Sequence, residues 1–528
     1  MRGSLWLFFL FPVLLQAQQE PPRIIIGIVV DQLRYELIDR MRPSFGDKGF
    51  GRLEKEGLSF DSLTYTYVPT YTGPGHATIF TGTTPSEHGI VGNHWYDPYR
   101  DRSFYCADDT VSGGDILVSS RNLMAPTFGD RLKMTGKLNQ VIGISLKDRG
   151  AIFPVGREGD LAIWLDDEGN FTSNSYYPSY TQYKDRLKAF NAPDRINDHL
   201  QGLWVPLAPD SVYETLCTPD AVSWEKAILR GRDPSFPYDL KELKQQKGFK
   251  GIRYVPAGNT LVFDLAYQLL PEMNVEGETQ MLTLGFSAPD YIGHDFGPLS
   301  WEVVDTYLRF NEELDKFILY LDSTIGRDHY LMFLTSDHGV ADPPGYSRSV
   351  GRKAENLYPT SIEEDIRRNT QGSIPFRYYD GGIYVYWDRM ADPDSTKIIR
   401  DLMNATRTLP YVLEAWSPKS DPLFHNEFSS FFQNGHFEGR SPDIRLIWQK
   451  YYIEYGSRGT THGSPFPYDA HVPGFFLGSG IPSGLHWKNK TPITFLAPFI
   501  LHKFGESIND WPSQILQMIR SLDQDIEP

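Results

Sequence analysis

The chain has 528 residues, of which 40% are hydrophobic and 14% aromatic, so it can bury a large core and does not belong to the disordered class. Its 67 acidic residues outnumber its 51 basic ones, and no run of Lys or Arg could follow a nucleic-acid backbone, so nucleic acid is not expected as a structural partner. A protein with a net charge of −16 that handles an anion must concentrate positive charge locally, which bound metal ions can do.

The N-terminus has the layout of a secretory signal peptide. Arg2 precedes an apolar run from Leu5 to Leu15, and a polar segment then permits cleavage after Ala17. The apolar run is shorter than the ~20 residues that a helix needs to span a bilayer. We therefore expect residues 1–17 to be removed and the mature protein to be exported, either to the periplasm or as a secreted protein, with no stable membrane span.

Four short runs of Ile, Val and Leu are continuous rather than alternating, which is typical of strands buried on both faces of a parallel sheet. They cover residues 23–30, 140–145, 280–286 and 329–334. Between the last two, residues 300–322 have apolar side chains mostly at helical spacing, so this region has the strand–helix–strand pattern of a βαβ unit. We expect one domain over residues 18–528, with insertions over the sheet near 150–258 and 351–455.

Acidic residues follow three of these strands: Asp31, Asp290 and Asp337. A single Asp at such a position is more often a turn residue or a helix N-cap. In open α/β sheets, however, the ligand site lies beyond the carboxyl ends of the strands, so the three carboxylates could converge there.

Histidines accompany two of the three carboxylates. Asp290 and His294 are four residues apart, and Asp337 and His338 are adjacent. Oxygen and imidazole ligands of this kind bind zinc, although each pair alone could equally consist of ordinary core or surface residues.

A third segment, Pro69 to His76, has the sequence Pro-Thr-Tyr-Thr-Gly-Pro-Gly-His. If a helix begins here, a hydroxyl would lie near free backbone N–H groups and the helix dipole, where anions bind. The ordinary alternative is a Thr/Gly/Pro turn.

Lys147 and Arg149, which follow the second predicted strand, would by themselves be interpreted as a solvated basic loop. Cys106 and Cys217 could form a disulfide or be two small buried residues, and the sequence leaves both possibilities open.

Together these segments resemble the alkaline phosphatase superfamily, because its ligand and nucleophile positions are filled in sequence order by Asp31, Thr72, Asp290, His294, Asp337, His338 and His462. The stretch Thr72-Gly-Pro-Gly-His is similar to the nucleophile segment of the nucleotide pyrophosphatase/phosphodiesterase branch. Two further segments, one containing Asn93 and the other Lys147 and Arg149, resemble those of the PafA-type bacterial alkaline phosphatases.

The resemblance implies an α/β fold, a three-layer sandwich with a mostly parallel central sheet flanked by helices and with inserted cap segments. It also implies two Zn²⁺ per chain, one held by Asp290, His294 and His462 and the other by Asp31, Asp337 and His338. His471 is the competitor of His462. Thr72 would lie beside the second zinc, and the phosphoryl oxygens would be held by Asn93, Lys147 and Arg149.

The activity implied is that of a zinc-dependent alkaline phosphatase, which hydrolyses small phosphate monoesters through a phosphothreonine formed on Thr72. The alternative is a phosphodiesterase or nucleotide pyrophosphatase of the same superfamily, since it would use the same metals and nucleophile. A third hypothesis is an inactive phosphate- or zinc-binding protein that kept the fold. We expect a monomer.

Overall fold

The computed structural model describes residues 21–192, 195–419 and 426–526. The expected signal peptide lies outside these residues. Among the described residues, no helix combines the length and the apolar character that crossing a membrane requires.

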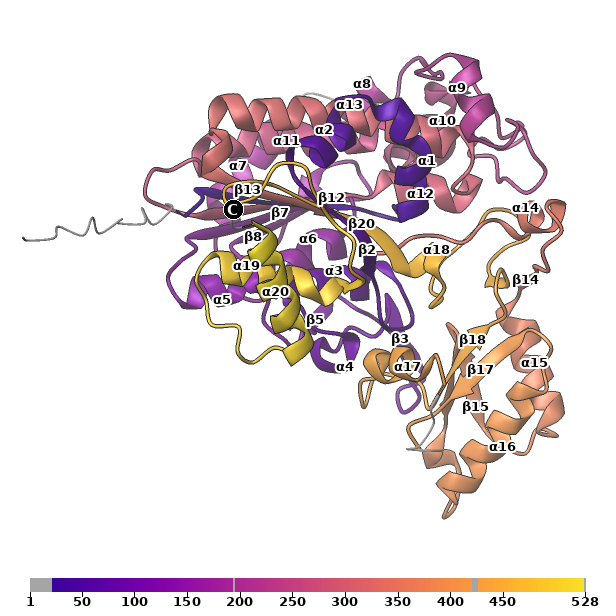
Figure 1. The fold of residues 1–528 in the computed structure, drawn as a ribbon. Coiled ribbons are helices and arrows are strands. Elements are labelled where there is room, and N and C mark those ends of the chain that lie inside the picture. Colours follow the sequence, from indigo (N-terminus) through magenta and orange to yellow (C-terminus); the bar gives the residue numbers. More distant parts are fainter. Residues whose placement is uncertain (1–20, 193–194, 420–425, 527–528) are drawn as a thin grey trace, which may run out of the picture.

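The central feature is a ten-stranded mixed sheet (Figure 1). In spatial order its main path comprises β21 (Leu485–Trp487), β2 (Leu58–Thr64), β20 (His471–Gly478), β13 (Tyr330–Thr335), β1 (Ile24–Val30), β12 (Gln280–Phe286), β7 (Gln140–Ser145), β8 (Leu161–Leu165) and β9 (Phe171–Thr172). The tenth strand, β22 (Thr491–Pro492), pairs with β2. Strands β13, β1, β12, β7 and β8 are parallel neighbours, whereas β20 and β9 run antiparallel to their neighbours.

The four predicted strands form the middle of this sheet. Strands β7 and β12 have the predicted bounds, and β1 and β13 each begin one residue later than predicted. Every residue of β1, β12 and β13 is buried, which explains why their sequences are continuous apolar runs.

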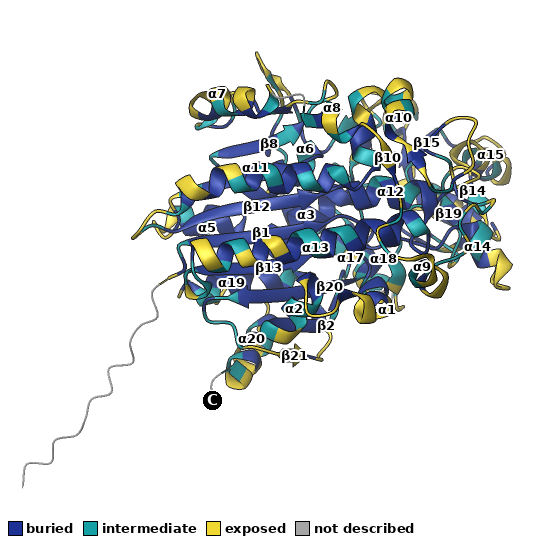
Figure 2. Ribbon diagram, turned by 90° about the horizontal axis from the view of Figure 1, so that it is seen from above, coloured by how far each residue is buried: buried dark blue, intermediate teal, exposed yellow. Residues whose placement is uncertain are grey.

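Helices cover both faces of the sheet (Figure 1). One face carries α11 (Ala257–Met273), α13 (Trp301–Thr324) and α2 (Gly49–Glu56), and the other carries α3 (Thr72–Thr81), α5 (Phe128–Met134), α6 (Asp148–Val155), α19 (Leu496–Lys503) and α20 (Ser513–Ile526). Seen from above, the strands are buried while α11 and α13 expose their outer sides (Figure 2). The predicted α/β sandwich with a mostly parallel sheet is confirmed.

The predicted helix of residues 300–322 is α13. Its first turn is capped by Ser300, whose hydroxyl accepts a hydrogen bond from the Val303 backbone N–H at 3.2 Å. The apolar residues that follow this spacing are buried, so the spacing correctly indicated which side of the helix faces the interior.

A smaller four-stranded sheet, which we call the cap, lies in the second region of weak periodicity. Its order is β15 (Phe376–Tyr379), β16 (Gly382–Val385), β18 (Ile444–Trp448) and β17 (Val412–Trp416), and it packs with α15 (Pro359–Asn369) and α16 (Ser395–Arg407). These elements share a hydrophobic core of their own, and they project to one side of the main body (Figure 1).

The first region of weak periodicity, 150–258, is arranged differently. It contributes β8 and β9 to one end of the central sheet before it continues as the short helices α7 (Tyr180–Asn191), α8 (Arg195–His199), α9 (Asp210–Leu216) and α10 (Leu240–Lys247). The start of this region is therefore part of the central sheet, and only the remainder is an insertion.

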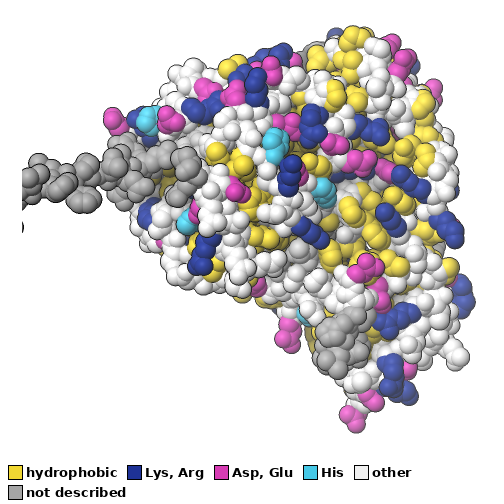
Figure 3. Space-filling model, in the orientation of Figure 1, with side chains coloured by type: hydrophobic (Ala, Val, Ile, Leu, Met, Phe, Trp, Pro, Cys, Tyr) yellow, Lys and Arg dark blue, Asp and Glu magenta, His cyan; other side chains and the backbone are white. Residues whose placement is uncertain are grey.

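Cys106 is buried, Cys217 is partly buried, and the two are not paired with each other. On the molecular face in Figure 3, Lys and Arg side chains are interspersed with Asp and Glu instead of forming one basic patch.

Candidate active site

The candidate site lies beyond the carboxyl ends of three adjacent parallel strands. Asp31 directly follows β1, α12 (Ala288–Phe296) begins just after β12, and Asp337 lies just after β13. Because β1 pairs with β12 on one side and β13 on the other, residues far apart in sequence lie side by side. This is the position that open α/β sheets use for ligands.

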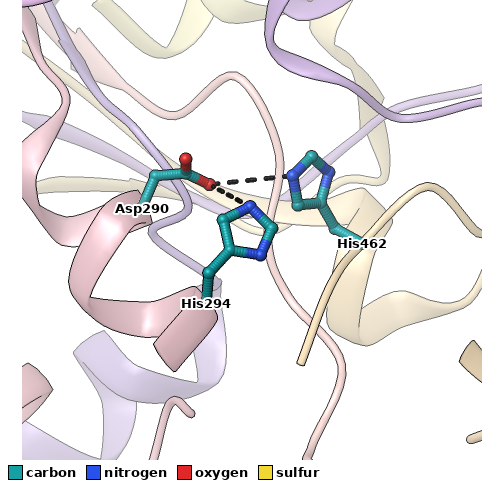
Figure 4. A group of neighbouring side chains, drawn as sticks. All are labelled: Asp290, His294 and His462. Atoms are coloured by element: carbon teal, nitrogen blue, oxygen red, sulfur yellow. Dashed lines mark ion pairs between the residues drawn. The ribbon is translucent and has the colours of Figure 1, made fainter. Parts of the chain in front are cut away.

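The first ligand group is Asp290, His294 and His462, whose side chains point toward one another (Figure 4). Asp290 Oδ1 lies 3.2 Å from His294 Nε2 and 3.6 Å from His462 Nε2. The spacing of four residues places Asp290 and His294 on one face of α12. His462 comes from the loop before α18 (Pro467–Ala470), much later in the chain.

The second group is Asp31, Asp337 and His338, all completely buried or nearly so. His338 Nε2 lies 3.4 Å from Asp31 Oδ1 and 3.6 Å from Asp337 Oδ2. Within the described part of the chain, neither of these buried oxygens has a hydrogen-bond partner. Since leaving a buried carboxylate oxygen unpaired is costly, the two oxygens fit a site built for a cation.

The three histidines have the same orientation. Their Nδ1 atoms lie 2.8 Å, 2.8 Å and 2.9 Å from the backbone carbonyl oxygens of Thr460, Thr70 and Gly339, for His294, His462 and His338 respectively. A carbonyl only accepts hydrogen bonds, so each Nδ1 donates, and in the neutral ring the Nε2 lone pair points into the cluster. Three carboxylates and three imidazoles thus form two donor sets that fit divalent metal ions such as zinc.

Burial and neighbouring charges shift the pKa values of two of the proposed ligands, Asp31 and His462. Burial and the carboxylates of Asp290 and Asp337 raise the pKa of Asp31 well above its ordinary value. Burial, reinforced by repulsion from His338 and His294, holds the pKa of His462 well below its ordinary value. His462 is therefore a neutral imidazole, the form that binds metals.

Thr72 lies at the first position of α3, with its hydroxyl oxygen 3.3 Å from His338 Nε2. Helix α3 approaches the second group closely because Gly75 has no side chain, and a Cβ there would lie 2.3 Å from the Asp337 carbonyl oxygen. Gly75, the second glycine of the Thr-Gly-Pro-Gly-His segment, thus allows the helix to bring Thr72 next to this group.

Asn93 and Lys147 also lie in the site. Asn93 Oδ1 accepts a hydrogen bond of 2.8 Å from the Gly73 backbone N–H, beside Thr72. Lys147 Nζ lies 2.5 Å from both Asp31 Oδ2 and Asp290 Oδ2, so it bridges the two ligand groups. Although burial lowers the pKa of Lys147, the two carboxylates outweigh it and hold that pKa above its ordinary value. The ammonium group is therefore charged.

Arg149 lies two residues further on, in the first turn of α6. Its Nη1 lies 3.5 Å from the Tyr105 hydroxyl, and its buried Nε has no hydrogen-bond partner among the residues that the structure describes. The guanidinium of Arg149 can therefore donate hydrogen bonds to an anion.

His471 does not belong to this site. Its Nε2 donates to the Asp61 carbonyl oxygen at 3.0 Å, and its ring stacks on Tyr35 with centroids 4.4 Å apart. Of the two competing histidines, the structure brings His462 to Asp290.

Two residues of the site were not predicted. Gln32 Nε2 donates to Asp290 Oδ1 at 2.7 Å, and its backbone N–H donates to Asp337 Oδ1 at 3.2 Å, so Gln32 connects both groups. Its φ of +68° is uncommon for a residue with a side chain. His76 Nδ1 lies 3.0 Å from the Thr72 carbonyl oxygen and 3.3 Å from Asp337 Oδ2. The sequence signals were adjacency to Asp31 for Gln32 and the spacing of four residues from Thr72 for His76.

A cleft of about 580 Å³ opens beside the first group, two of whose members, His294 and His462, belong to its lining. The main body contributes Tyr71, Asn93 and His462 to its lining, and the cap contributes Asp380 and Arg445. The organic part of a substrate whose reacting atom lies at Thr72 can occupy this space.

Comparisons with known proteins agree with this geometry. The family described as type I phosphodiesterase/nucleotide pyrophosphatase matches residues 25–464. Alkaline phosphatase PafA of Elizabethkingia meningoseptica is 35% identical over 494 residues, and the match covers 88% of each chain. Alkaline phosphatase PhoV of Synechococcus elongatus is 33% identical over 479 residues, covering 88% of this chain and 86% of that protein.

The crystal structure of PafA superimposes with a TM-score of 0.83 and 31% identity, covering 92% of this chain and 96% of PafA. A second PafA structure, with the same TM-score, carries substitutions of a Thr, an Asn, a Lys and an Arg. The chain therefore belongs to the type I phosphodiesterase/nucleotide pyrophosphatase family and, within it, to the PafA-type alkaline phosphatases, a group of phosphoric monoester hydrolases.

Proposed function

We propose that the protein is an exported alkaline phosphatase that binds two zinc ions and hydrolyses phosphate monoesters with Thr72 as its nucleophile. The observation that carries the proposal is the Thr72 hydroxyl at 3.3 Å from His338, beside two convergent ligand groups. We further propose that the enzyme acts as a monomer.

The ligand assignment follows from the donor sets. Asp290, His294 and His462 would hold one ion, and Asp31, Asp337 and His338 the other. When bound, two such ions would stabilise the charge that develops on the attacking and leaving oxygens.

In the reaction, Thr72 gives up its hydroxyl proton to solvent, and its oxygen attacks phosphorus in line with the leaving oxygen. The phosphorus–oxygen bond to the leaving group breaks as the phosphothreonine forms, and the departing oxygen takes up a proton from water. Water then attacks from the side that the alcohol has left, which releases phosphate and restores the Thr72 hydroxyl. The position of Thr72 at a helix start favours this chemistry, because the N-terminal dipole of α3 stabilises negative charge there.

Asn93, Lys147 and Arg149 are proposed to hold the phosphoryl oxygens. In support, the substituted Asn of the PafA variant follows the Thr by the same interval as Asn93 follows Thr72, and one residue separates its Lys from its Arg, as between Lys147 and Arg149. Cationic donors of this kind favour a monoester, which presents more charged oxygens than a diester.

The second candidate is a phosphodiesterase, favoured by the family match over residues 25–464. The test compares kcat/KM for p-nitrophenyl phosphate and bis(p-nitrophenyl) phosphate with zinc-reconstituted protein. We expect the monoester to be strongly preferred, and acid-quenched protein to carry phosphate on Thr72 by mass spectrometry. A preference for the diester would support the second candidate instead.

A further inference from the structure

A hydrogen bond connects the cap to the residue that precedes Thr72. Tyr71, the N-cap residue of α3, donates its hydroxyl to Asp380 Oδ1 at 2.7 Å. Tyr71 belongs to the main body and Asp380 to the cap, and the two are far apart in sequence. The bond therefore joins two separately packed parts of the molecule next to the candidate nucleophile.

The cap side of this bond is well defined. Asp380 and Gly381 form the loop between β15 and β16, where Tyr379 pairs with Gly382. Both loop residues have positive φ, +48° and +67°, as in the type I′ turns for which Asp-Gly is a preferred sequence. Arg445 Nη1 also donates to the Asp380 carbonyl oxygen at 2.6 Å, which fixes the turn.

The body side is equally constrained. The Tyr71 ring meets the His462 ring edge-on, with centroids 5.5 Å apart and an interplanar angle of 82°. A Cβ on Gly463 would lie 2.6 Å from Tyr71 Cε1, so only glycine permits this approach. Tyr71 thus contacts a proposed metal ligand through its ring and is joined to Thr72 through the backbone.

We propose that Asp380 is a positioning residue for the reaction: by accepting the Tyr71 hydroxyl, it holds Tyr71 against His462 and fixes the start of the helix that carries Thr72. This inference rests on the proposed function. The ordinary explanation, that Asp380 serves only its turn, accounts for the backbone conformation but not for a side chain that reaches the main body. Asp380 would thereby link the position of the cap on the main body to the position of Thr72.

The cap also contacts the body through hydroxyls that do not reach Thr72. The Tyr386 hydroxyl lies 2.8 Å from the Tyr96 hydroxyl and donates to Asp101 Oδ1 at 2.8 Å. Replacement of Tyr386 by Phe therefore removes a comparable hydroxyl from the same interface and serves as the matched control.

The test uses Tyr71→Phe, Asp380→Gly, the double variant and Asp380→Asn. Glycine suits the turn but has no acceptor, whereas asparagine suits the turn and keeps one. We expect Tyr71→Phe and Asp380→Gly each to lower kcat about tenfold, with KM less affected. The double variant should lose no more than either single one, because all three remove the same bond. Asp380→Asn should retain most of the activity, and Tyr386→Phe should match the wild type.

Additive losses in the double variant, or equal losses in Asp380→Asn and Asp380→Gly, would overturn the inference. If the wild type hydrolyses no phosphoester, the proposed function fails, and amide hydrogen exchange of a peptide spanning residues 70–78 then decides the positioning role. Faster exchange in Tyr71→Phe and Asp380→Gly, but not in Tyr386→Phe, supports that role. Unchanged exchange contradicts it.

Discussion

Thr72 is the residue on which the proposed chemistry depends. Thr72→Ala should lower monoester kcat about a thousandfold or more, since it removes the attacking oxygen, while zinc content and thermal stability change little. Thr72→Ser keeps a hydroxyl and should retain measurable turnover. Thr83→Ala, on the loop after α3, is the control. Wild-type kcat in Thr72→Ala would refute the assignment.

Lys147 and Arg149 provide a test of substrate class. A monoester presents charged oxygens to them in the transition state, whereas a diester carries one charge fewer and an additional group. Loss of a charge-assisted contact is worth about 1.5–3 kcal/mol, or roughly one to two orders of magnitude in rate. The double replacement Lys147→Ala/Arg149→Ala should therefore lower kcat/KM for monoesters far more than for diesters.

The contacts of Lys147 in the structure also explain what equal losses on monoesters and diesters would mean. Its ammonium bridges Asp31 and Asp290, two of the proposed ligands. Equal losses on monoesters and diesters, accompanied by altered zinc content, would show that Lys147 serves the ligand carboxylates and not the phosphoryl group.

The choice between His462 and His471 can be tested by metal analysis. His462→Ala should remove one ligand from the first group and lower the zinc content toward one ion per chain, as measured by elemental analysis of dialysed protein. His471→Ala should keep the zinc content, because the His471 ring bonds to the Asp61 carbonyl oxygen and stacks on Tyr35, away from both ligand groups. Zinc loss in His471→Ala but not in His462→Ala would show that His471 is the metal ligand.

At the scale of the element, the position of Thr72 depends on how closely α3 packs against the segment that follows β13. Gly75→Ala would place a Cβ 2.3 Å from the Asp337 carbonyl oxygen, so the helix must shift. We expect a loss of roughly 1–3 kcal/mol in the free energy of unfolding. Activity should fall more than that loss explains, because the shift moves Thr72 away from His338.

Gly456→Ala is the matched control for this substitution, because the nearest atom to its Cβ would be the Arg458 carbonyl oxygen at 4.0 Å. Urea denaturation and kcat should both be nearly unchanged. A Gly75→Ala protein with wild-type kcat would show that the helix tolerates displacement.

At the scale of the whole molecule, metal binding should stabilise the fold. The two groups bring together side chains from the segments that follow β1 and β13, from α12 and from the loop before α18, so ions bound there would link distant parts of the chain. Binding adds about 4 kcal/mol per site when free zinc is about a thousand times Kd. Chelation should lower the melting temperature and abolish turnover, and zinc should restore both. A melting temperature indifferent to chelator would contradict the proposed sites.

Much of this protein could be predicted from its sequence. Strands buried on both faces need apolar residues at every position, so β1, β7, β12 and β13 were recognisable locally. Asp31, Asp290 and Asp337 could be placed at one end of the sheet because the ends of parallel strands coincide. The spacing of His294 from Asp290 likewise follows from the helical repeat.

The tertiary structure alone decided the contacts between segments far apart in sequence. The sequence favours His462 over His471 through the resemblance of its His-Gly context to the family motif, whereas its position beside Asp290 depends on which loop returns to α12. Gln32 connects two ligand groups only because β1 lies between β12 and β13. The Tyr71–Asp380 bond likewise requires the cap to be seated on the body, since periodicity describes an element by itself whereas such contacts arise when elements pack together.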